Sequence, residues 1–171
     1  MFTRKAEHKD LSSILAIYNQ GIEDGLATLE EDMKDITYME NWFKNHQDRY
    51  VALVAENEEG TITGWASINP YSSRCAYKGV GEISIYIHRE YRGKKIGQLL
   101  LKALEKTAVH QQFYKLVLHT FPINAQGQAL YRKMNFRQVG ILTNQGKLRG
   151  KYVDIMIMEK LLFEETFYLK E

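Results

Sequence analysis

The chain has 171 residues, of which 44% are apolar and 26% charged, so its size and composition fit one globular domain and exclude a disordered segment. Its 23 basic and 21 acidic residues nearly balance, which argues against a surface built for nucleic acid or anionic lipid. Because it has one cysteine, Cys75, and neither a secretory h-region nor an apolar run of about 20 residues, we expect a cytoplasmic protein without disulfides or membrane helices.

The first third of the chain predicts one strand and two helices. Residues 2–6 are typical of a short strand, and Asp10 then opens a helical pattern of apolar residues. We expect Gly21 and Gly25 to break this helix. Residues 36–43 indicate a second amphipathic helix, and the loop before it is a candidate wall of a substrate site.

The middle of the chain indicates three strands followed by a helix. Residues 50–56 and 61–68 predict an antiparallel hairpin around the polar turn 57–60. Residues 81–88 continue the sheet as a further strand. Residues 96–110 then carry apolar side chains along one helical face, so a strand, a basic loop and a helix follow one another.

The last third repeats this order and ends in a hairpin. Residues 114–119 predict a strand and residues 125–134 a helix. Two further strands are expected at 136–142 and 152–158, around a polar, glycine-containing turn at 145–150. These elements predict an α/β fold with a mixed sheet and helices on both faces.

The most informative stretch is a basic loop between the strand of Glu82 and the helix at 96–110. The loop contains Arg92, Gly93, Lys94, Lys95, Ile96 and Gly97. A helix N-terminus presents N–H groups and a positive dipole end to an anion, so a pyrophosphate would suit this loop. The alternative is a solvated connection, because short glycine patterns are common. The spacing fits neither the kinase nor the dehydrogenase phosphate loop.

Two residues, Glu82 and Tyr131, are candidates for catalysis. Strand alternation places Glu82 within a strand otherwise built for burial, where its carboxylate would become a better proton acceptor. A strand glutamate is more often a salt-bridge partner. Asn124 and Tyr131 lie seven residues apart, and this spacing puts them on nearly the same helical face. A lone helical tyrosine is more often a core residue.

With its flanking strand and helix, the basic loop resembles the Arg/Gln-x-x-Gly-x-Gly/Ala pyrophosphate loop of GNAT acetyltransferases, with Lys95 at the position of the usual middle glycine. Asn124, Tyr131 and Phe136 resemble a second family signature. The resemblance implies the GNAT fold, a mixed, mostly antiparallel sheet of about seven strands. It also implies one acetyltransferase domain over residues 1–163, with a C-terminal tail over 164–171.

Residues 4–162 resemble the phosphinothricin acetyltransferase branch of that family, and most of all its arsinothricin-resistance N-acetyltransferases. The segments that carry this resemblance are residues 17–22, 27–29, 64–66, 70–71, 76–77, 81–86, 115–117, 121–124 and 146–154, the last being the most branch-specific. The resemblance implies acetyl-coenzyme A as co-substrate, no metal, and the α-amine of a phosphinothricin, methionine sulfoximine or arsinothricin type of amino acid as acceptor. It also implies a homodimer.

The resemblance further implies roles for single residues. Glu82 is expected to be the base, and we expect Tyr131 to protonate the leaving thiolate. The cofactor-binding residues are expected to be Ile85, Tyr86, Ile87, Arg92, Gly93, Lys94, Lys95, Ile96, Gly97, Gln98, Asn124 and Tyr131. Arg74 and Tyr77 are assigned to the acceptor carboxylate, since a guanidinium fork matches it. Lys147, Arg149 and Lys151 are alternatives for the acceptor's oxyacid end, although a charged hairpin tip is more often solvated.

These assignments predict direct transfer: the deprotonated amine attacks the thioester, and an amide N–H near Ile85 stabilises the developing oxyanion. Two other functions stay open. A non-catalytic sensor would use the same loop to bind acyl-coenzyme A without releasing thiol. A protein or peptide N-acetyltransferase would share the chemistry but not the acceptor.

Overall fold

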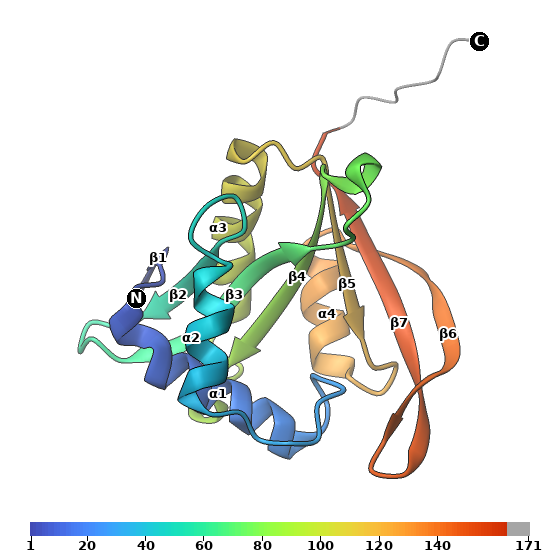
Figure 1. The fold of residues 1–171 in the computed structure, drawn as a ribbon, viewed down its shortest axis with the longest axis horizontal. Coiled ribbons are helices and arrows are strands. Elements are labelled where there is room, and N and C mark those ends of the chain that lie inside the picture. Colours follow the sequence, from blue (N-terminus) through green and yellow to red (C-terminus); the bar gives the residue numbers. More distant parts are fainter. Residues whose placement is uncertain (164–171) are drawn as a thin grey trace.

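The computed structural model describes residues 1–163, and the predicted tail over 164–171 lies outside the described residues. Seven strands form one sheet in the order β1-β2-β3-β4-β5-β7-β6 (Figure 1). The strands are β1 (Phe2–Lys5), β2 (Ala52–Glu56), β3 (Ile62–Pro70), β4 (Val80–Ile87), β5 (Lys115–Thr120), β6 (Arg137–Leu148) and β7 (Lys151–Leu161). The helices are α1 (Leu11–Asp24), α2 (Ile36–Lys44), α3 (Ile96–His110) and α4 (Ala125–Lys133). The predicted α/β class and the seven-stranded sheet are confirmed.

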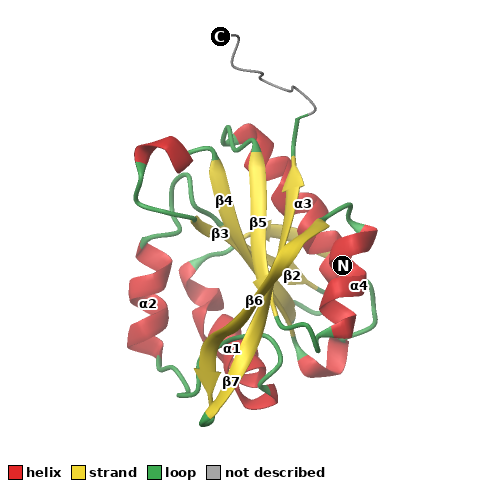
Figure 2. Cartoon of the chain, turned by 90° about the vertical axis from the view of Figure 1, so that its right-hand side faces the viewer, coloured by secondary structure: helices red, strands yellow, loops and turns green. Residues whose placement is uncertain are grey.

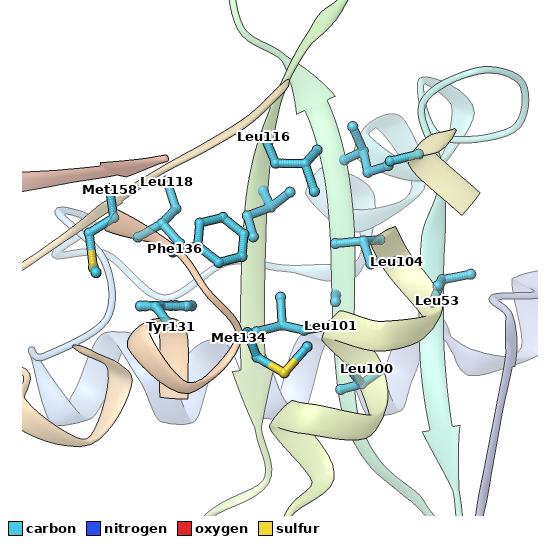
Figure 3. Packing of buried hydrophobic residues seen from close by; sticks show 14 of the residues in the cluster. Leu53, Leu100, Leu101, Leu104, Leu116, Leu118, Tyr131, Met134, Phe136 and Met158 are labelled. Carbon is cyan, nitrogen blue, oxygen red and sulfur yellow. The ribbon is translucent and has the colours of Figure 1, made fainter. Parts of the chain in front are cut away.

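Helices cover both faces of this sheet, as predicted (Figure 2). The larger core cluster lies under α3 and α4 and includes Leu100, Leu104, Leu116 and Phe136 (Figure 3). A second cluster packs α1 and α2 against the opposite face. Full burial of one such leucine or phenylalanine contributes about 1.5–3 kcal/mol, so the two clusters fix the layers. Within residues 1–163, no helix combines the length and apolar character needed to cross a membrane.

One parallel strand pair interrupts the antiparallel order of the sheet. β4 and β5 are hydrogen-bonded neighbours only from Val80↔Lys115 to Glu82↔Val117. Beyond this point β4 continues beside β3 as far as Ile87, whereas β5 continues beside β7. The two strands therefore separate after Glu82, and Figure 1 shows them diverging toward α1.

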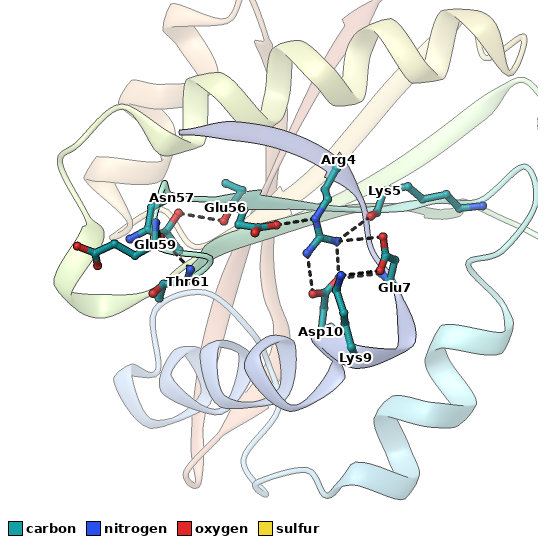
Figure 4. A network of polar contacts seen from close by, with 11 residues as sticks. Arg4, Lys5, Glu7, Lys9, Asp10, Glu56, Asn57, Glu59 and Thr61 are labelled. Atoms are coloured by element: carbon teal, nitrogen blue, oxygen red, sulfur yellow. Dashed lines mark hydrogen bonds and ion pairs between the residues drawn. The ribbon is translucent and has the colours of Figure 1, made fainter.

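A charged network fastens the N-terminal strand to the start of α1 (Figure 4). The guanidinium of Arg4 donates to both carboxylate oxygens of Asp10, at 2.7 and 2.9 Å, and to Glu56 at 2.6 Å. Burial opposes ionisation of Asp10, but the hydrogen bonds from Arg4 and from the Glu7 amide hold its pKa below the usual value. The network joins β1, β2 and α1, three elements that are separated in the sequence.

One predicted helix end and one predicted hairpin turn differ from the structure. α1 continues through Gly21 and ends at Gly25, whose φ of 64° provides the left-handed helix cap. The prediction that Gly21 breaks the helix was wrong: a Cβ there would lie 2.9 Å from the Tyr86 ring, so this glycine allows β4 to pack closely. β6 also extends to Leu148, which leaves Arg149 and Gly150, both with positive φ, as a two-residue hairpin turn.

We predict that Gly21→Ala destabilises the protein. In an ordinary helix interior this substitution stabilises by about 0.5–1 kcal/mol, but here the clash with Tyr86 should lower the free energy of unfolding by about 1–3 kcal/mol. Urea denaturation measures the change. Gly140→Ala is the matched control, because its added Cβ would meet nothing within 4 Å. A more stable Gly21→Ala variant would contradict the packing explanation.

Candidate active site

A cleft of about 210 Å³ opens where β4 and β5 separate. Its walls come from the loop between α1 and α2, from β4, from the end of β5, and from α4 and β7. The lining residues are Ala27, Thr28, Leu29, Glu82, Ile83, Ser84, Ile85, Tyr86, His119, Thr120, Phe121, Asn124, Tyr131 and Ile155. Five of the predicted site residues, Glu82, Ile85, Tyr86, Asn124 and Tyr131, are thus brought together, and the α1–α2 loop is a wall of this cleft.

Glu82 lies at the last position where β4 pairs with β5. Its side chain is 34% exposed, so the predicted burial was wrong. Its Oε1 instead lies 2.8 Å from Nδ1 of His119 on β5. Sequence analysis missed His119, but the pairing of Glu82 with Val117 explains the contact: His119 follows Val117 by two residues and therefore projects from the same sheet face.

Asn124 and Tyr131 face the cleft from α4. Asn124 is the N-cap residue: its Oδ1 accepts from the Gly127 amide at 3.0 Å, and its Nδ2 donates to Thr120 at 3.2 Å. Tyr131 is 8% exposed, and burial raises the pKa of its phenol. Tyrosine is ordinarily protonated at neutral pH, and burial strengthens that preference here.

The strand edge beside the cleft offers free backbone groups. Within residues 1–163, no strand pairs with the β5 side of β4 beyond Glu82. Ile85 and Ile87 pack part of their side chains on the larger core. The Tyr86 ring packs against Gly21 of α1, and its hydroxyl donates to the Ala27 carbonyl in the α1–α2 loop at 3.3 Å. These contacts anchor the main chain at 83–87, and along its outer edge the Ile87 carbonyl accepts from Nε of Arg92 at 3.4 Å.

The basic loop leads from β4 into the N-terminus of α3, as the sequence predicted. Gly93 has a φ of 75°, and an added Cβ there would meet nothing within 4 Å. Lys95 has a φ of 64° and is the N-cap of α3, so it adopts the left-handed conformation that a glycine takes without strain. A Cβ on Gly97 would lie 2.6 Å from Leu130, so this glycine serves helix packing.

Arg92 is paired with α1 in this structure. Its Nη2 lies 2.6 Å from Oδ2 of Asp24, and Arg89 contacts the other oxygen at 2.8 Å. Burial opposes ionisation of Asp24, but these two guanidinium groups hold its pKa below the usual value. The pair ties the basic loop to the C-terminal end of α1.

Arg74 and Tyr77 lie apart from the cleft. Both belong to the segment before β4, where Cys75–Tyr77 form a 3₁₀ turn. Their side chains are exposed, and the Tyr77 ring packs edge-on against Tyr71 at 5.6 Å. Neither residue lines the cleft, so the structure does not bring them to the other predicted site residues.

A second cavity, of about 250 Å³, adjoins the cleft on the α1–α2 face of the sheet. We call it the aromatic pocket, and its lining residues are Tyr18, Tyr38, Met39, Trp42, Trp65, Asn69, Glu82, Ser84 and Tyr86. Glu82, Ser84 and Tyr86 line both cavities. Sequence analysis did not predict this pocket, because its rings come from α1, α2, β3 and β4.

The C-terminal hairpin holds the loop wall of the cleft. Nη2 of Arg149 donates to the carbonyls of Ile22 and Glu23 at 3.2 Å, and the Arg149 amide donates to Glu31 at 2.6 Å. A Cβ on Gly146 would lie 3.0 Å from Leu29. Arg149 therefore caps the C-terminus of α1, while Lys147 lies over the Tyr152 ring at 5.8 Å. Among residues 1–163, no cluster of His, Cys, Asp and Glu could hold a metal ion.

Residues 14–136 match the acetyltransferase (GNAT) family, and the chain belongs to that family. It is 31% identical over 157 residues to an L-methionine sulfoximine/L-methionine sulfone acetyltransferase of Pseudomonas aeruginosa, covering 91% of each chain. The protein is thus an acetyl-coenzyme A-dependent N-acetyltransferase of the phosphinothricin and methionine sulfoximine acetyltransferase type.

Solved structures of N-acetyltransferases share the fold of this chain. A phosphinothricin acetyltransferase from Sinorhizobium meliloti, crystallised in complex with acetyl-coenzyme A, has a TM-score of 0.90 and 31% identity, over 96% of this chain and 89% of that one. A ribosomal-protein-alanine N-acetyltransferase from Brucella melitensis has a TM-score of 0.91 and 32% identity, over 94% and 99% of the two chains. The GNAT fold expected from the sequence is confirmed.

We predict that Arg149→Ala loosens the loop wall. Loss of its hydrogen bonds to the end of α1 should lower the free energy of unfolding by about 1–2 kcal/mol. Hydrogen exchange should also become faster across residues 25–31. Lys147→Ala, on the same hairpin, is the control. Unchanged exchange in 25–31 would show that Arg149 does not hold the loop.

Proposed function

We propose that the protein transfers the acetyl group of acetyl-coenzyme A directly to the α-amine of a small amino acid of the phosphinothricin, methionine sulfoximine or arsinothricin type. The observation that carries the proposal is the position of Glu82. Its carboxylate lies on the wall shared by the cleft and the aromatic pocket, where β4 and β5 separate. An amine beside Glu82 can therefore meet an acyl group in the cleft.

Acetyl-coenzyme A fits the cleft and the basic loop in this proposal. The free edge of β4 at Ile85, Tyr86 and Ile87 offers main-chain groups to the pantetheine arm, in the manner of an added strand. Residues 92–98 take the pyrophosphate, supported by the open space at Gly93 and by the helix dipole of α3. Arg92 must exchange Asp24 for phosphate oxygens to take part.

Glu82 acts as the base in the proposed reaction. An α-ammonium has a pKa near 8 and must lose its proton before it can attack a thioester. The exposed side of Glu82 leaves room for the amine or for one bridging water, and the contact with His119 fixes the carboxylate. An amide N–H near Ile85 donates to the carbonyl oxygen as negative charge develops there.

Tyr131 acts as the acid that protonates the departing thiolate. The side chain is buried and lines the cleft, and its phenol is protonated at neutral pH, as tyrosines ordinarily are, with burial raising its pKa further. Asn124 supports the arrangement by capping α4. The carboxylate role of Arg74 and Tyr77, the homodimer, the single domain over 1–163 and the cytoplasmic location stay predictions.

A second candidate function is acetylation of a protein amino terminus. It is favoured by the 32% identity to the Brucella melitensis ribosomal-protein-alanine N-acetyltransferase. The two functions share Glu82 and Tyr131 and differ in the acceptor. A non-catalytic sensor needs neither residue, and membership of the acetyltransferase family disfavours it.

An acceptor panel tests the proposal. Purified protein and acetyl-coenzyme A are mixed with phosphinothricin, methionine sulfoximine, arsinothricin, polyamines or peptides, and thiol release is followed. We expect release with the amino acids and little with polyamines. Release confined to peptides would favour the second candidate function.

We predict that Tyr131→Phe lowers kcat about 100-fold, since a positioned general acid contributes at least that factor. The KM for acetyl-coenzyme A should change little, because the ring stays in place. Steady-state thiol release measures both constants. Tyr152→Phe, at an exposed tyrosine that does not line the cleft, is the control. An unchanged kcat would remove Tyr131 from the mechanism.

A further inference from the structure

His119 faces Glu82 where β4 and β5 separate. Strand alternation directs both side chains to the α1–α2 face of the sheet, because Ile83, Leu116 and Leu118 point into the larger core on the other face. Nδ1 of His119 lies 2.8 Å from Oε1 of Glu82, and both residues line the cleft. The two groups therefore lie together at the place where the acceptor's amine is proposed to bind.

The contact determines which nitrogen of His119 can take up a proton. An ionised carboxylate only accepts hydrogen bonds, so Nδ1 is the nitrogen that carries hydrogen and donates to Glu82. In a neutral imidazole the other nitrogen, Nε2, then keeps its lone pair. The side chain is 36% exposed, so water reaches the ring. The pair thus has two positions open to protons, the second oxygen of Glu82 and Nε2 of His119.

Tyr131 approaches the cleft from the opposite face of the sheet. Its ring belongs to the larger core under α3 and α4, whereas Glu82 and His119 project toward α1 and α2. The proposed acid for the thiolate and the proposed base for the amine are therefore on different faces. Protons that leave the acceptor nitrogen are accordingly released on the side of Glu82 and His119.

The acceptor nitrogen must lose two protons during the reaction. An α-ammonium carries three hydrogens on nitrogen, and the amide product carries one. In the proposed function, Glu82 takes the first proton before the amine attacks. The second proton leaves after the nitrogen has bonded to the thioester carbon, when Glu82 already holds a proton and Tyr131 acts as a donor. The reaction therefore calls for a second acceptor beside the nitrogen.

We propose that His119 is this second proton acceptor, an inference that rests on the proposed function and adds a residue to its mechanism. As the C–N bond forms and the C–S bond breaks, the nitrogen gives its second proton to Nε2 of His119, directly or through one water. Tyr131 gives its own proton to sulfur at the same stage. His119 thereby acts on the acceptor side of the reaction and Tyr131 on the thiol side.

Charges and protons then balance within the cleft. The imidazolium of His119 offsets the phenolate left on Tyr131, and within residues 1–163 no lysine or arginine lines the cleft to repel it. His119 returns one proton to Tyr131 through water, and Glu82 loses its proton to solvent. One ammonium and one thioester are thus converted into one amide, one free thiol and one proton.

His119→Asn separates proton uptake from the orientation of Glu82. An asparagine amide can still donate to the carboxylate, but it cannot take up a proton. Enzyme preloaded with acetyl-coenzyme A is mixed with a saturating concentration of the best amino-acid acceptor, and the single-turnover rate of thiol release is measured. We expect the rate to fall at least about tenfold, since a positioned base contributes about 10²–10⁴-fold and water replaces part of its role. The KM for acetyl-coenzyme A should stay unchanged.

His119→Ala provides the second measurement, because it leaves space for a base supplied from solution. Added imidazole should restore part of its single-turnover rate, and the restored rate should follow the concentration of uncharged imidazole. His110→Asn is the matched control, at an exposed histidine that ends α3 and does not line the cleft. This control should keep the wild-type rate.

The outcomes distinguish the inference from the proposed function. A wild-type rate in His119→Asn would show that His119 only orients Glu82 and would overturn the inference. A His119→Ala variant that imidazole does not rescue would overturn it as well. If the wild-type protein released no thiol with any amino acid, the proposed function itself would be contradicted.

Discussion

The early end of the β4–β5 ladder is the constraint on which the site depends. The two strands are neighbours for only three residue pairs, because β4 then follows β3 and β5 follows β7. When two strands separate in the middle of a sheet, their backbone N–H and C=O groups need new hydrogen-bond partners. It also creates a cleft bounded by two strands, with Glu82 at the last paired position. The shape of the cleft, its free backbone groups and the position of the Glu82 carboxylate thus all follow from the separation of β4 and β5.

Elements distant in sequence keep this opening in shape. Gly21 lets Tyr86 pack beneath α1, and the Tyr86 hydroxyl holds the Ala27 carbonyl on the opposite wall. The C-terminal hairpin then secures the same loop, through Arg149 at the end of α1 and through close contact of Gly146 with Leu29. The hairpin motif at 146–154 therefore acts here on the loop that lines the cleft.

The residues of the basic loop have different structural roles. Gly93 faces open space and allows a ligand to approach, whereas Gly97 makes room for Leu130. Lys95 accepts the left-handed conformation despite its side chain, and it therefore keeps the geometry of the loop while adding a charge. Arg92 meanwhile pairs with Asp24, which links the loop to α1.

Local pattern was enough to predict most of the fold and part of the site. Apolar periodicity indicated the helices and strands, and the strand, basic loop and helix around Arg92 indicated an anion site from neighbouring residues alone. Glu82 and Tyr131 were singled out in the same way. The helix break expected at Gly21 was wrong, since the reason for that glycine is the Tyr86 ring on another element.

The sequence by itself determined the class of fold, the order of elements and the position of the basic loop before α3, because these follow from periodicity and from contacts between near neighbours. Only the tertiary structure decided that His119 meets Glu82, that Arg149 caps α1 and that five aromatic rings enclose a pocket beside Glu82. Such contacts depend on strand register and helix packing, which are set by the whole chain and leave no fixed spacing in the sequence.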